Sequence, residues 1–544
     1  MSRYTMDSPA CSEADMLKQL ASLIDSASFF KIVWETPYTP CTGITAVVAQ
    51  MLEPFANLGA VIAPWHGQMK EATEAIAGGA VVRTGITFQV KGGAGPIEVR
   101  ILLAAHKGRM PIIFLEADGF FLGHPYPPAP ELRRDSVLFA LALVRLFERL
   151  GGARTDQWLW GADWEAVPGL LLLKDRHHVA LHLHNTYDEY LWNEMVDLNY
   201  PVRAVFRHAS ALQAGMREAD VVATVNRGYA WSLQNELIHT RVQADYLQNL
   251  LCRMVPVENA NFKQLLPEVK ALASDLTDSA KAVEALAAFK TAARTRLPAE
   301  IREPVAGKTL MVVMGRRVTQ KLPEIVVEGV RLTLKEDPRL FVLFATMPAG
   351  DAASDVRLGQ IKALVGEYPS NACWTDGRVS FYDDLMLAAD YTVMWSLSEP
   401  HGGCMQGPVV PIIRSIDGLA AQCPALEPTG IAAGLNARWH GKKRPAGLTA
   451  REEPDIGEQQ TIDDLREILR KAPDVDNATT RAMVATLKQT LLKAVAIHQT
   501  QPAVFAALTR EVLQIQLRRS WEINYGGMFS HIAAATVRRP IGSG

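Results

Sequence analysis

The stretch MGRRVTQKLPEIVVEGV, residues 314–330, contains the change from strand to helix on which the fold class rests. An apolar run ends at Gly315, and Arg316 and Lys321 stand on either side of a turn that opens a helix. Two cations beside a helix amino terminus suit a diphosphate, because charge, helix dipole and free N–H groups all attract the anion. Two solvated cations at a plain helix start are the alternative, and this stretch alone leaves both open.

Strand-like and helix-like segments alternate on both sides of this stretch. Upstream, short apolar runs that end at polar or turn residues predict buried strands at 29–35, 110–116, 177–185 and 220–226. Residues 135–152 have the apolar spacing of a helix and end at a glycine. Runs like the first four recur at 308–316, 339–348, 390–398 and 407–415. The alternation predicts an α/β protein with parallel sheets covered on both faces.

The bulk composition is that of a globular protein of several domains. The chain has 544 residues, of which 48% are hydrophobic and 21% charged, with a net charge of −2. The chain lacks the excess of basic residues that would indicate a nucleic-acid partner, and it lacks the runs of charge that would indicate binding to a membrane surface. The six cysteines contain no Cys-x-x-Cys pair, which argues against a disulfide framework or a zinc site. Without a secretory signal or an apolar run of about 20 residues, we expect a soluble, cytoplasmic protein.

A second informative stretch is SLSEPHGGCMQGPVVPIIRSIDGL, residues 396–419. Here a strand ends at Glu399, and a glycine turn with Gly402 and Gly403 precedes the next apolar strand. A carboxylate at a strand end can accept hydrogen bonds from sugar hydroxyls, and glycines let backbone N–H groups approach a phosphate. A helix-capping glutamate beside an ordinary glycine turn is the alternative.

Taken together, the two stretches resemble the donor-binding half of the glycogen/starch synthase family. The family's GRLTEQKG reads GRRVTQKL at 315–322, and its F-E-P-C-G-L-T-Q reads S-E-P-H-G-G-C-M at 398–405. Its G-x-x-P-I-V-R-x-x-G-G-L corresponds to G-P-V-V-P-I-I-R-S-I-D-G-L at 407–419. Further segments similar to family motifs follow the family's order: 41–51, 114–121, 161–176, 184–191 and 214–233.

This resemblance implies a GT-B fold, in which two Rossmann-like domains face each other across a deep cleft. We expect an N-terminal acceptor-side domain over 1–258, a helical connector over 259–305 and a nucleotide-sugar-binding domain over 306–515. The remaining residues, 516–544, are expected to form a helix and tail that pack back on the N-terminal domain. Ligands of such folds bind at the carboxyl ends of parallel strands.

The resemblance also implies a reaction, transfer of glucose from a nucleotide diphosphate sugar to an α-glucan with retention of configuration. ADP-glucose or UDP-glucose is the expected donor, no separate cofactor or metal is implied, and a second copy of the chain is a further candidate partner. The expected site residues are Gly43, Asp135, Arg316, Lys321, Tyr382, Glu399, Gly402, Gly403 and Cys404.

Each of these residues has a role that the resemblance implies. Arg316 and Lys321 would hold the diphosphate, and Glu399 would bind hydroxyls of the glucosyl unit. Asp135 would position the sugar from the other domain, and Tyr382 would stack on the base. The backbone around residues 402–404 would approach sugar and phosphate.

The N-terminal half departs from the family pattern at several positions. The family's lysine before the glycine pair falls on Pro40, its first glycine falls on Thr42, and its histidine falls on Ala162, whereas Gly43 is kept. In the other half, a family threonine falls on Cys404. Three hypotheses stay open: a glucan synthase with a rebuilt N-terminal side, a glycosyltransferase with another donor or acceptor, and a non-catalytic relative that binds sugar or proteins. The intact donor half favours a retained nucleotide-sugar site.

Overall fold

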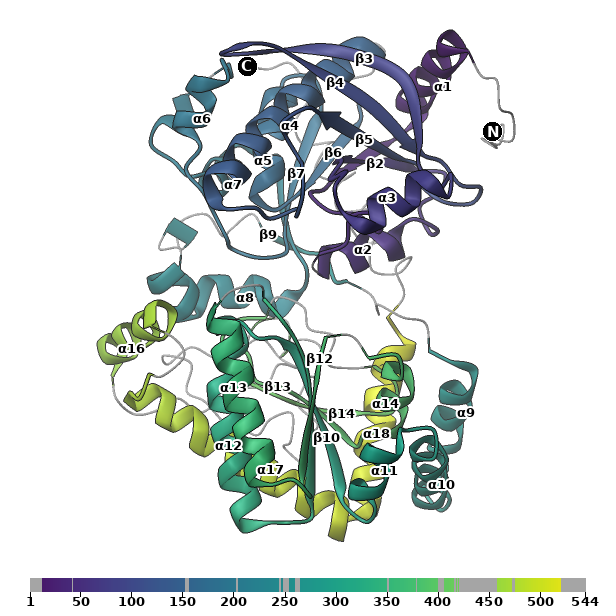
Figure 1. Ribbon diagram of the computed structural model, residues 1–544, viewed down its shortest axis with the longest axis vertical. Coiled ribbons are helices and arrows are strands. Elements are labelled where there is room, and N and C mark those ends of the chain that lie inside the picture. Colours follow the sequence, from purple (N-terminus) through teal and green to yellow (C-terminus); the bar gives the residue numbers. More distant parts are fainter. Residues whose placement is uncertain are drawn as a thin grey trace. The chain divides into compact units, whose positions relative to one another are not determined.

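The structure is a computed structural model that describes most of the chain. The described residues are 12–41, 43–151, 156–201, 204–243, 246–247, 254–259, 265–349, 352–377, 379–399, 406–414, 417, 419, 457–471 and 475–519. They divide into two compact units (Figure 1). Unit 1 contains the described residues of Met1–Val225 and Leu250–Phe262, and unit 2 those of Asn226–Asn249 and Lys263–Ser520. Within the described ranges no helix has the length and apolar character that crossing a membrane requires.

Unit 1 is built on a sheet with the strand order β3-β4-β5-β2-β1-β6-β7-β8-β9. Its strands are β1 (Phe29–Ile32), β2 (Gly59–Pro64), β3 (Val82–Gly92), β4 (Gly95–Ala104), β5 (Ile112–Ala117), β6 (Trp158–Ala162), β7 (His178–Leu183), β8 (Val221–Thr224) and β9 (Met254–Pro256). The four strands expected upstream of the opening stretch correspond to β1, β5, β7 and β8. The core from β5 to β9 is parallel, as the alternation predicted.

The prediction of wholly parallel sheets is wrong at one edge of unit 1. There β3 and β4 form an antiparallel hairpin, and β4 also runs antiparallel to β5. Buried and more exposed residues alternate along β3, the pattern of a sheet with one solvated face. The two-residue connection Gly93-Ala94 closes the hairpin between Gly92 and Gly95. This edge therefore faces water on one side, unlike the parallel core.

Helices α1 (Glu13–Ser26), α2 (Gly43–Met51), α3 (Lys70–Ala77), α4 (Ala129–Leu150), α5 (Asp163–Leu173), α6 (Trp192–Asp197) and α7 (Ala211–Glu218) complete unit 1. Helix α5 is buried on almost every side. A Cβ at Gly169 would lie 2.8 Å from Leu143 Cδ2, and one at Gly215 would lie 2.7 Å from Val167 Cγ2. Glycines at these contacts let α4 and α7 pack closely on α5. The packing holds the start of α5, at the carboxyl end of β6, in a fixed position.

Unit 2 has a parallel sheet with the order β12-β11-β10-β13-β14. The strands are β10 (Thr309–Arg316), β11 (Leu340–Met347), β12 (Ala372–Asp376), β13 (Tyr391–Met394) and β14 (Val410–Ile413). The four strands expected in this half correspond to β10, β11, β13 and β14, whereas β12 was not expected. From β10 the chain proceeds outward to β11 and β12, then returns to the other side of β10 as β13. The strand order therefore reverses between β10 and β13.

The helices of unit 2 are α8 (Arg227–Asn235), α9 (Pro267–Asp275), α10 (Ala282–Arg294), α11 (Ala299–Val305), α12 (Pro323–Glu336), α13 (Ala352–Glu367), α14 (Tyr382–Ala388), α16 (Glu458–Lys471), α17 (Ala478–Thr500) and α18 (Pro502–Leu517), with a π-helical turn η2 (Ile238–Gln243). The expected connector, 259–305, contains α9, α10 and α11 in its described part. The first expected domain, 1–258, differs from unit 1, because Asn226–Asn249 belongs to unit 2. Leu237 and Ile238 lie in the same apolar cluster as Leu310 of β10. The expected packing of the tail concerns residues that, beyond 519, lie outside the described ones.

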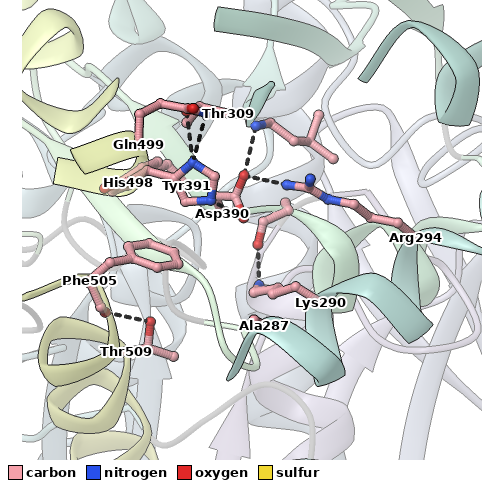
Figure 2. A network of polar contacts seen from close by, with 12 residues as sticks. Ala287, Lys290, Arg294, Thr309, Asp390, Tyr391, His498, Gln499, Phe505 and Thr509 are labelled. Carbon is pink, nitrogen blue, oxygen red and sulfur yellow. Dashed lines mark hydrogen bonds and ion pairs between the residues drawn. The ribbon is translucent and has the colours of Figure 1, made fainter. Parts of the chain in front are cut away.

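A buried ionic network joins the amino ends of β10 and β13 to two helices of unit 2. Asp390 accepts a hydrogen bond of 2.8 Å from the Leu310 N–H and pairs with Arg294 of α10. Its other oxygen lies 3.3 Å from His498 Nε2 of α17, and Figure 2 shows Arg294 and His498 turned toward Asp390 from two sides. Burial alone would raise the pKa of Asp390, but the attraction of His498 and Arg294 is stronger and lowers it to about 2. This network supports the end of the sheet opposite to the predicted site.

Candidate active site

The loops after β10 and β13 meet at the carboxyl edge of the unit 2 sheet. The Leu397 N–H donates to the Gln320 carbonyl at 2.7 Å, and Gln320 Nε2 donates to the Ser398 carbonyl at 2.8 Å. These bonds join the two stretches that the sequence singled out. They lie where the strand order reverses, which is the place where open α/β sheets bind ligands.

An ion pair between Lys321 and Glu399 occupies this junction. The Lys321 ammonium contacts Glu399 Oε2, and 17% and 10% of the two side chains are exposed. Ser396 Oγ donates a second bond to the same carboxylate oxygen at 3.3 Å. The fold thus brings a cation suited to a phosphate and a carboxylate suited to hydroxyls into direct contact.

The backbone before Lys321 has an unusual conformation that lets the lysine lie over the end of β10. Gly315 has a φ of 131°, a value that L residues rarely adopt, and a Cβ atom at this position would contact the Lys321 stem at 3.5 Å. Leu322 has a φ of 48° and Pro323 begins α12 directly after it. Proline suits a first helical turn, where its missing N–H would have no partner. The lysine therefore projects from a short, conformationally restricted turn.

Arg316 and Arg317 are adjacent but have different surroundings. Arg317 is 1% exposed and pairs with Asp376 at 2.8 Å, so it is a structural residue. Arg316, the last residue of β10, is half-buried, and in the described part of the chain no carboxylate pairs with its guanidinium. Arg317 follows the last residue of β10, and its different surroundings separate the two roles. Arg316 is the one that can receive an anion.

The buried Arg357 of α13 holds the turn that carries Lys321. It donates to the Arg317 carbonyl at 3.0 Å and to Thr319 Oγ1 at 2.9 Å, and it pairs with Glu324 at 2.6 Å. Sequence reasoning missed Arg357, because an arginine inside a helix carries no motif. The role of Arg357 follows from its position in the structure, since only the fold places α13 against this turn.

Tyr382 begins α14 and lies beside the end of β10. Its hydroxyl donates to Gln406 Oε1 at 3.0 Å and contacts Met314 Sδ at 3.4 Å. Burial raises the pKa of the phenol, so the ring stays neutral. Of the other residues expected on this side, Gly402, Gly403 and Cys404 lie outside the described residues.

Asp135, expected to position the sugar, is engaged within unit 1. It lies in α4, is 5% exposed, and its Oδ2 accepts the Phe121 N–H at 2.9 Å. Burial raises its pKa, although the Phe121 bond and Arg134 act in the opposite direction. Phe121 has a φ of 54°, so the carboxylate stabilises a strained turn after β5. Gly43, another expected residue, is exposed at the start of α2 with open space around it.

Where the family's histidine would stand, unit 1 has a buried ionic group. Ala162 ends β6 and is 2% exposed, and Asp163 follows it with a φ of 55°. Asp163 Oδ1 accepts the N–H groups of His184 and Asn185 at 2.7 and 3.1 Å. The family-like HN pair at 184–185 therefore holds a carboxylate. Burial raises the pKa of Asp163 to about 7.

Lys31 and Glu35 belong to the same edge of the sheet and were not expected from the sequence. Lys31 Nζ lies 3.4 Å from His182 Nδ1 and 4.5 Å from the Trp160 ring centroid. Burial lowers the pKa of Lys31 to about 7, although Asp163 acts in the opposite direction. Glu35 accepts hydrogen bonds from Thr45 Oγ1 at 2.6 Å and from the Cys41 N–H at 2.9 Å. In the sequence, Lys31 is only an exception to the apolar pattern of a buried strand, and nothing there indicates its contacts.

Comparison with known proteins relates this geometry to a family. The family model for the starch synthase catalytic domain matches residues 31–248. That segment is similar to the starch synthase catalytic domain family. A comparison with curated protein sequences finds no match.

Solved structures show a likeness in fold over nearly the whole chain. The catalytic domain of starch synthase IV from Arabidopsis thaliana, bound to ADP and acarbose, aligns with 94% of this chain and 99% of that chain, at 15% identity and a TM-score of 0.66. Sucrose-phosphate synthase from Thermosynechococcus elongatus aligns over 93% and 100%, at 14% identity and a TM-score of 0.52. HepE from Anabaena in complex with UDP aligns over 93% and 100%, at 10% identity and a TM-score of 0.50. The predicted GT-B fold is confirmed.

Proposed function

We propose that this starch synthase relative transfers a glucosyl unit from a nucleotide diphosphate sugar to an α-glucan, with retention of configuration. The observation that carries the proposal is the Lys321–Glu399 ion pair at the sheet edge where the strand order reverses. Arg316 adds a second cation at the end of the central strand. Two cations and a carboxylate that follow the ends of neighbouring strands match the charges and hydroxyls of a sugar diphosphate.

The reaction requires stabilisation of the negative charge that forms where the bond between the glucosyl unit and the diphosphate breaks. As the bond to the diphosphate breaks, negative charge grows on the departing phosphate, and Lys321 and Arg316 stabilise it. Donors fixed in place before the reaction need no reorganisation at that moment. Glu399 accepts hydrogen bonds from glucosyl hydroxyls and orients the sugar. In the free protein its contact with Lys321 keeps both charges compensated.

The choice of donor follows from the ligands of similar structures and from Tyr382. The Arabidopsis structure holds ADP and the Anabaena structure holds UDP. The Tyr382 hydroxyl contacts Met314 of β10, and the Tyr382 ring offers a surface on which either base can stack. We therefore propose ADP-glucose or UDP-glucose as donor, with Gly402, Gly403 and Cys404 supplying backbone contacts.

A second candidate is a glycosyltransferase with a different donor sugar or acceptor. The observation in its favour is the rebuilt edge of unit 1, where Pro40 and Ala162 replace the family's lysine and histidine. Glu35, Asp163 and Lys31 form a buried ionic group there instead. Groups that contact the sugar or acceptor set specificity, so a changed edge favours a changed substrate.

The experiment that tests the proposal is a binding and transfer assay on wild type, Lys321→Ala and Lys308→Ala. Lys308 is the matched control, because it precedes the opposite end of β10 and donates to the Ser370 carbonyl. Calorimetry with ADP-glucose and UDP-glucose should show binding about 10- to 100-fold weaker for Lys321→Ala, the range of a charge-assisted hydrogen bond. Lys308→Ala should bind like wild type.

Incorporation of labelled glucose into glycogen then separates the candidates. Transfer to glycogen supports the glucan synthase, and donor binding with transfer only to another acceptor supports the second candidate. Donor binding without any transfer indicates a non-catalytic relative. Equal donor affinity of all three proteins would remove Lys321 from the site and refute the proposal.

A further inference from the structure

Asp417 stands where the resembled family has a glycine. The family's R-x-x-G-G-L reads R-S-I-D-G-L here, so Asp417 takes the place of the first glycine. Its φ is 46°, in the left-handed region that glycine adopts without strain. Aspartate tolerates that region better than most residues, but at a cost compared with glycine. A costly replacement at a buried position calls for a compensating interaction.

The Asp417 carboxylate makes such interactions with the residues before and at Glu399. Its Oδ2 accepts the Glu399 N–H and the Ser398 hydroxyl, both at 2.8 Å. Its Oδ1 lies 2.9 Å from His239 Nε2, and its own N–H donates to Ser232 Oγ at 3.1 Å. A glycine at this position could make only the last of these contacts.

The whole network is shielded from water. Asp417, His239 and Ser232 have no exposed surface, and Ser398 is 6% exposed. Hydrogen bonds gain strength in so dry an environment. His239 and Ser232 come from η2 and α8, the segment that the fold assigns to unit 2. Two residues far from β13 in the sequence, His239 and Ser232, thus help to hold the loop that follows β13 within unit 2.

A second anchor limits the same loop from its other side. Arg414, at the end of β14, donates to the carbonyls of Ser396 and Leu397 at 3.4 and 3.1 Å. Arg414 binds the carbonyl groups of Ser396 and Leu397, and Asp417 binds the N–H of Glu399. The backbone of the loop up to Glu399 is therefore held through both its carbonyl and its N–H groups. The Glu399 side chain contacts Lys321 and Ser396 Oγ at the end of this fixed backbone.

We propose that Asp417 is a positioning residue for Glu399, which it holds so that the Glu399 carboxylate faces the glucosyl unit of the donor. The inference rests on the proposed function, because it assigns the sugar of the donor to Glu399. It requires that Asp417 act on the sugar part of the ligand and leave the diphosphate contacts of Arg316 and Lys321 unchanged.

The test is calorimetry of Asp417→Asn with two ligands, ADP-glucose and ADP. Asp390→Asn is the matched control, because Asp390 is equally buried in unit 2 but lies at the opposite end of the sheet. Asp417→Asn should weaken ADP-glucose binding about tenfold, the loss of one hydrogen bond to a charged group, and should change ADP binding less than about twofold. Asp390→Asn should change neither affinity. In a Glu399→Ala background, Asp417→Asn should weaken ADP-glucose binding no further.

Two results would overturn the inference. One is an equal loss of affinity for ADP and ADP-glucose, and the other is a loss that persists without Glu399. If Asp417→Asn does not fold, Ser398→Ala, which removes one of the two bonds to Oδ2, replaces it and should give the same selective loss.

A ligand-free measurement separates failure of this inference from failure of the proposed function. Wild-type protein that binds neither ligand would refute the proposed donor. A double-mutant cycle of Asp417→Asn and Ser398→Ala in urea unfolding still tests the positioning contact, because residues in contact do not act additively. Coupling of at least about threefold in the unfolding equilibrium constant supports the contact, and additive effects overturn the inference.

Discussion

Replacing Asp390 by asparagine should lower the stability of this protein by about 2 kcal/mol at neutral pH. Asp390 is fully buried, and its pKa is lowered to about 2 from a usual value of 3.8. That difference in pKa corresponds to about 2 kcal/mol of stabilisation by the ionised carboxylate. The neutral amide would also leave the Arg294 guanidinium without its anionic partner.

The pH dependence of this effect has a definite sign. The folded pKa lies below the unfolded one, so the stabilisation is fully present above about pH 4 and is lost as pH falls toward 2. About half of it should remain at about pH 3. Urea unfolding of both proteins between about pH 7 and pH 3 should therefore show a stability difference that shrinks as the solution becomes acidic.

Asp476→Asn is the control for this experiment. Asp476 pairs with Arg481 at 2.8 Å, but its side chain is 80% exposed, and such surface pairs contribute little. Its replacement should leave stability nearly unchanged at every pH. A difference between wild type and Asp390→Asn that is absent at neutral pH, or that does not shrink in acid, would refute the reasoning.

Other predictions concern the two sheet edges. Lys31→Met should be least harmful near pH 7 and below, because the Lys31 pKa of about 7 lies under its unfolded value and wild-type stability rises with pH above 7. Urea unfolding of both proteins at about pH 7 and pH 9 measures how stability changes with pH, and an equal change in the two proteins would contradict the prediction. Gly315→Ala should cost about 1 kcal/mol, because its φ of 131° disfavours a side chain, and calorimetric scanning against Gly359→Ala, which has open space, measures it. Pro40→Lys with Ala162→His should lower native transfer and yield no glucan if the edge is rebuilt, and a gain of glucan synthesis would exclude that interpretation. Transfer activity should survive EDTA, since the site rests on Arg316 and Lys321, and recovery only on adding Mg²⁺ or Mn²⁺ would show the mechanism to be wrong.

The roles of Arg316, Lys321, Glu399 and Tyr382 stay predictions, but their placement explains why sequence reasoning reached them. Arg316, Lys321 and Glu399 follow strands that the sequence predicted, and the carboxyl ends of parallel strands meet at one edge of a sheet. Tyr382 was reached through the family resemblance alone. Lys31, Glu35, Arg357 and Asp417 could not be reached in this way. Their importance depends on which residues they touch, and a lysine in an apolar strand or an aspartate in a glycine position is merely irregular in the sequence.

The sequence by itself determined the fold class and the positions of the main strands along the chain. Apolar runs with polar ends are local signals, and motifs in a fixed order carry the GT-B architecture without knowledge of any contact. β3 and β4 show the limit of this reasoning, because strand pairing direction depends on which neighbours the hairpin finds.

Only the tertiary structure decided which charged groups meet. Lys321 and Glu399 pair because β13 returns to the side of β10, and Asp417 reaches Glu399 because the segment with His239 packs into unit 2. Arg316 and Arg317 are equivalent in the sequence, yet one is half-buried at the strand end and the other is paired inside. These outcomes depend on strand order and side-chain direction over long sequence separations, and local patterns contain no information about either.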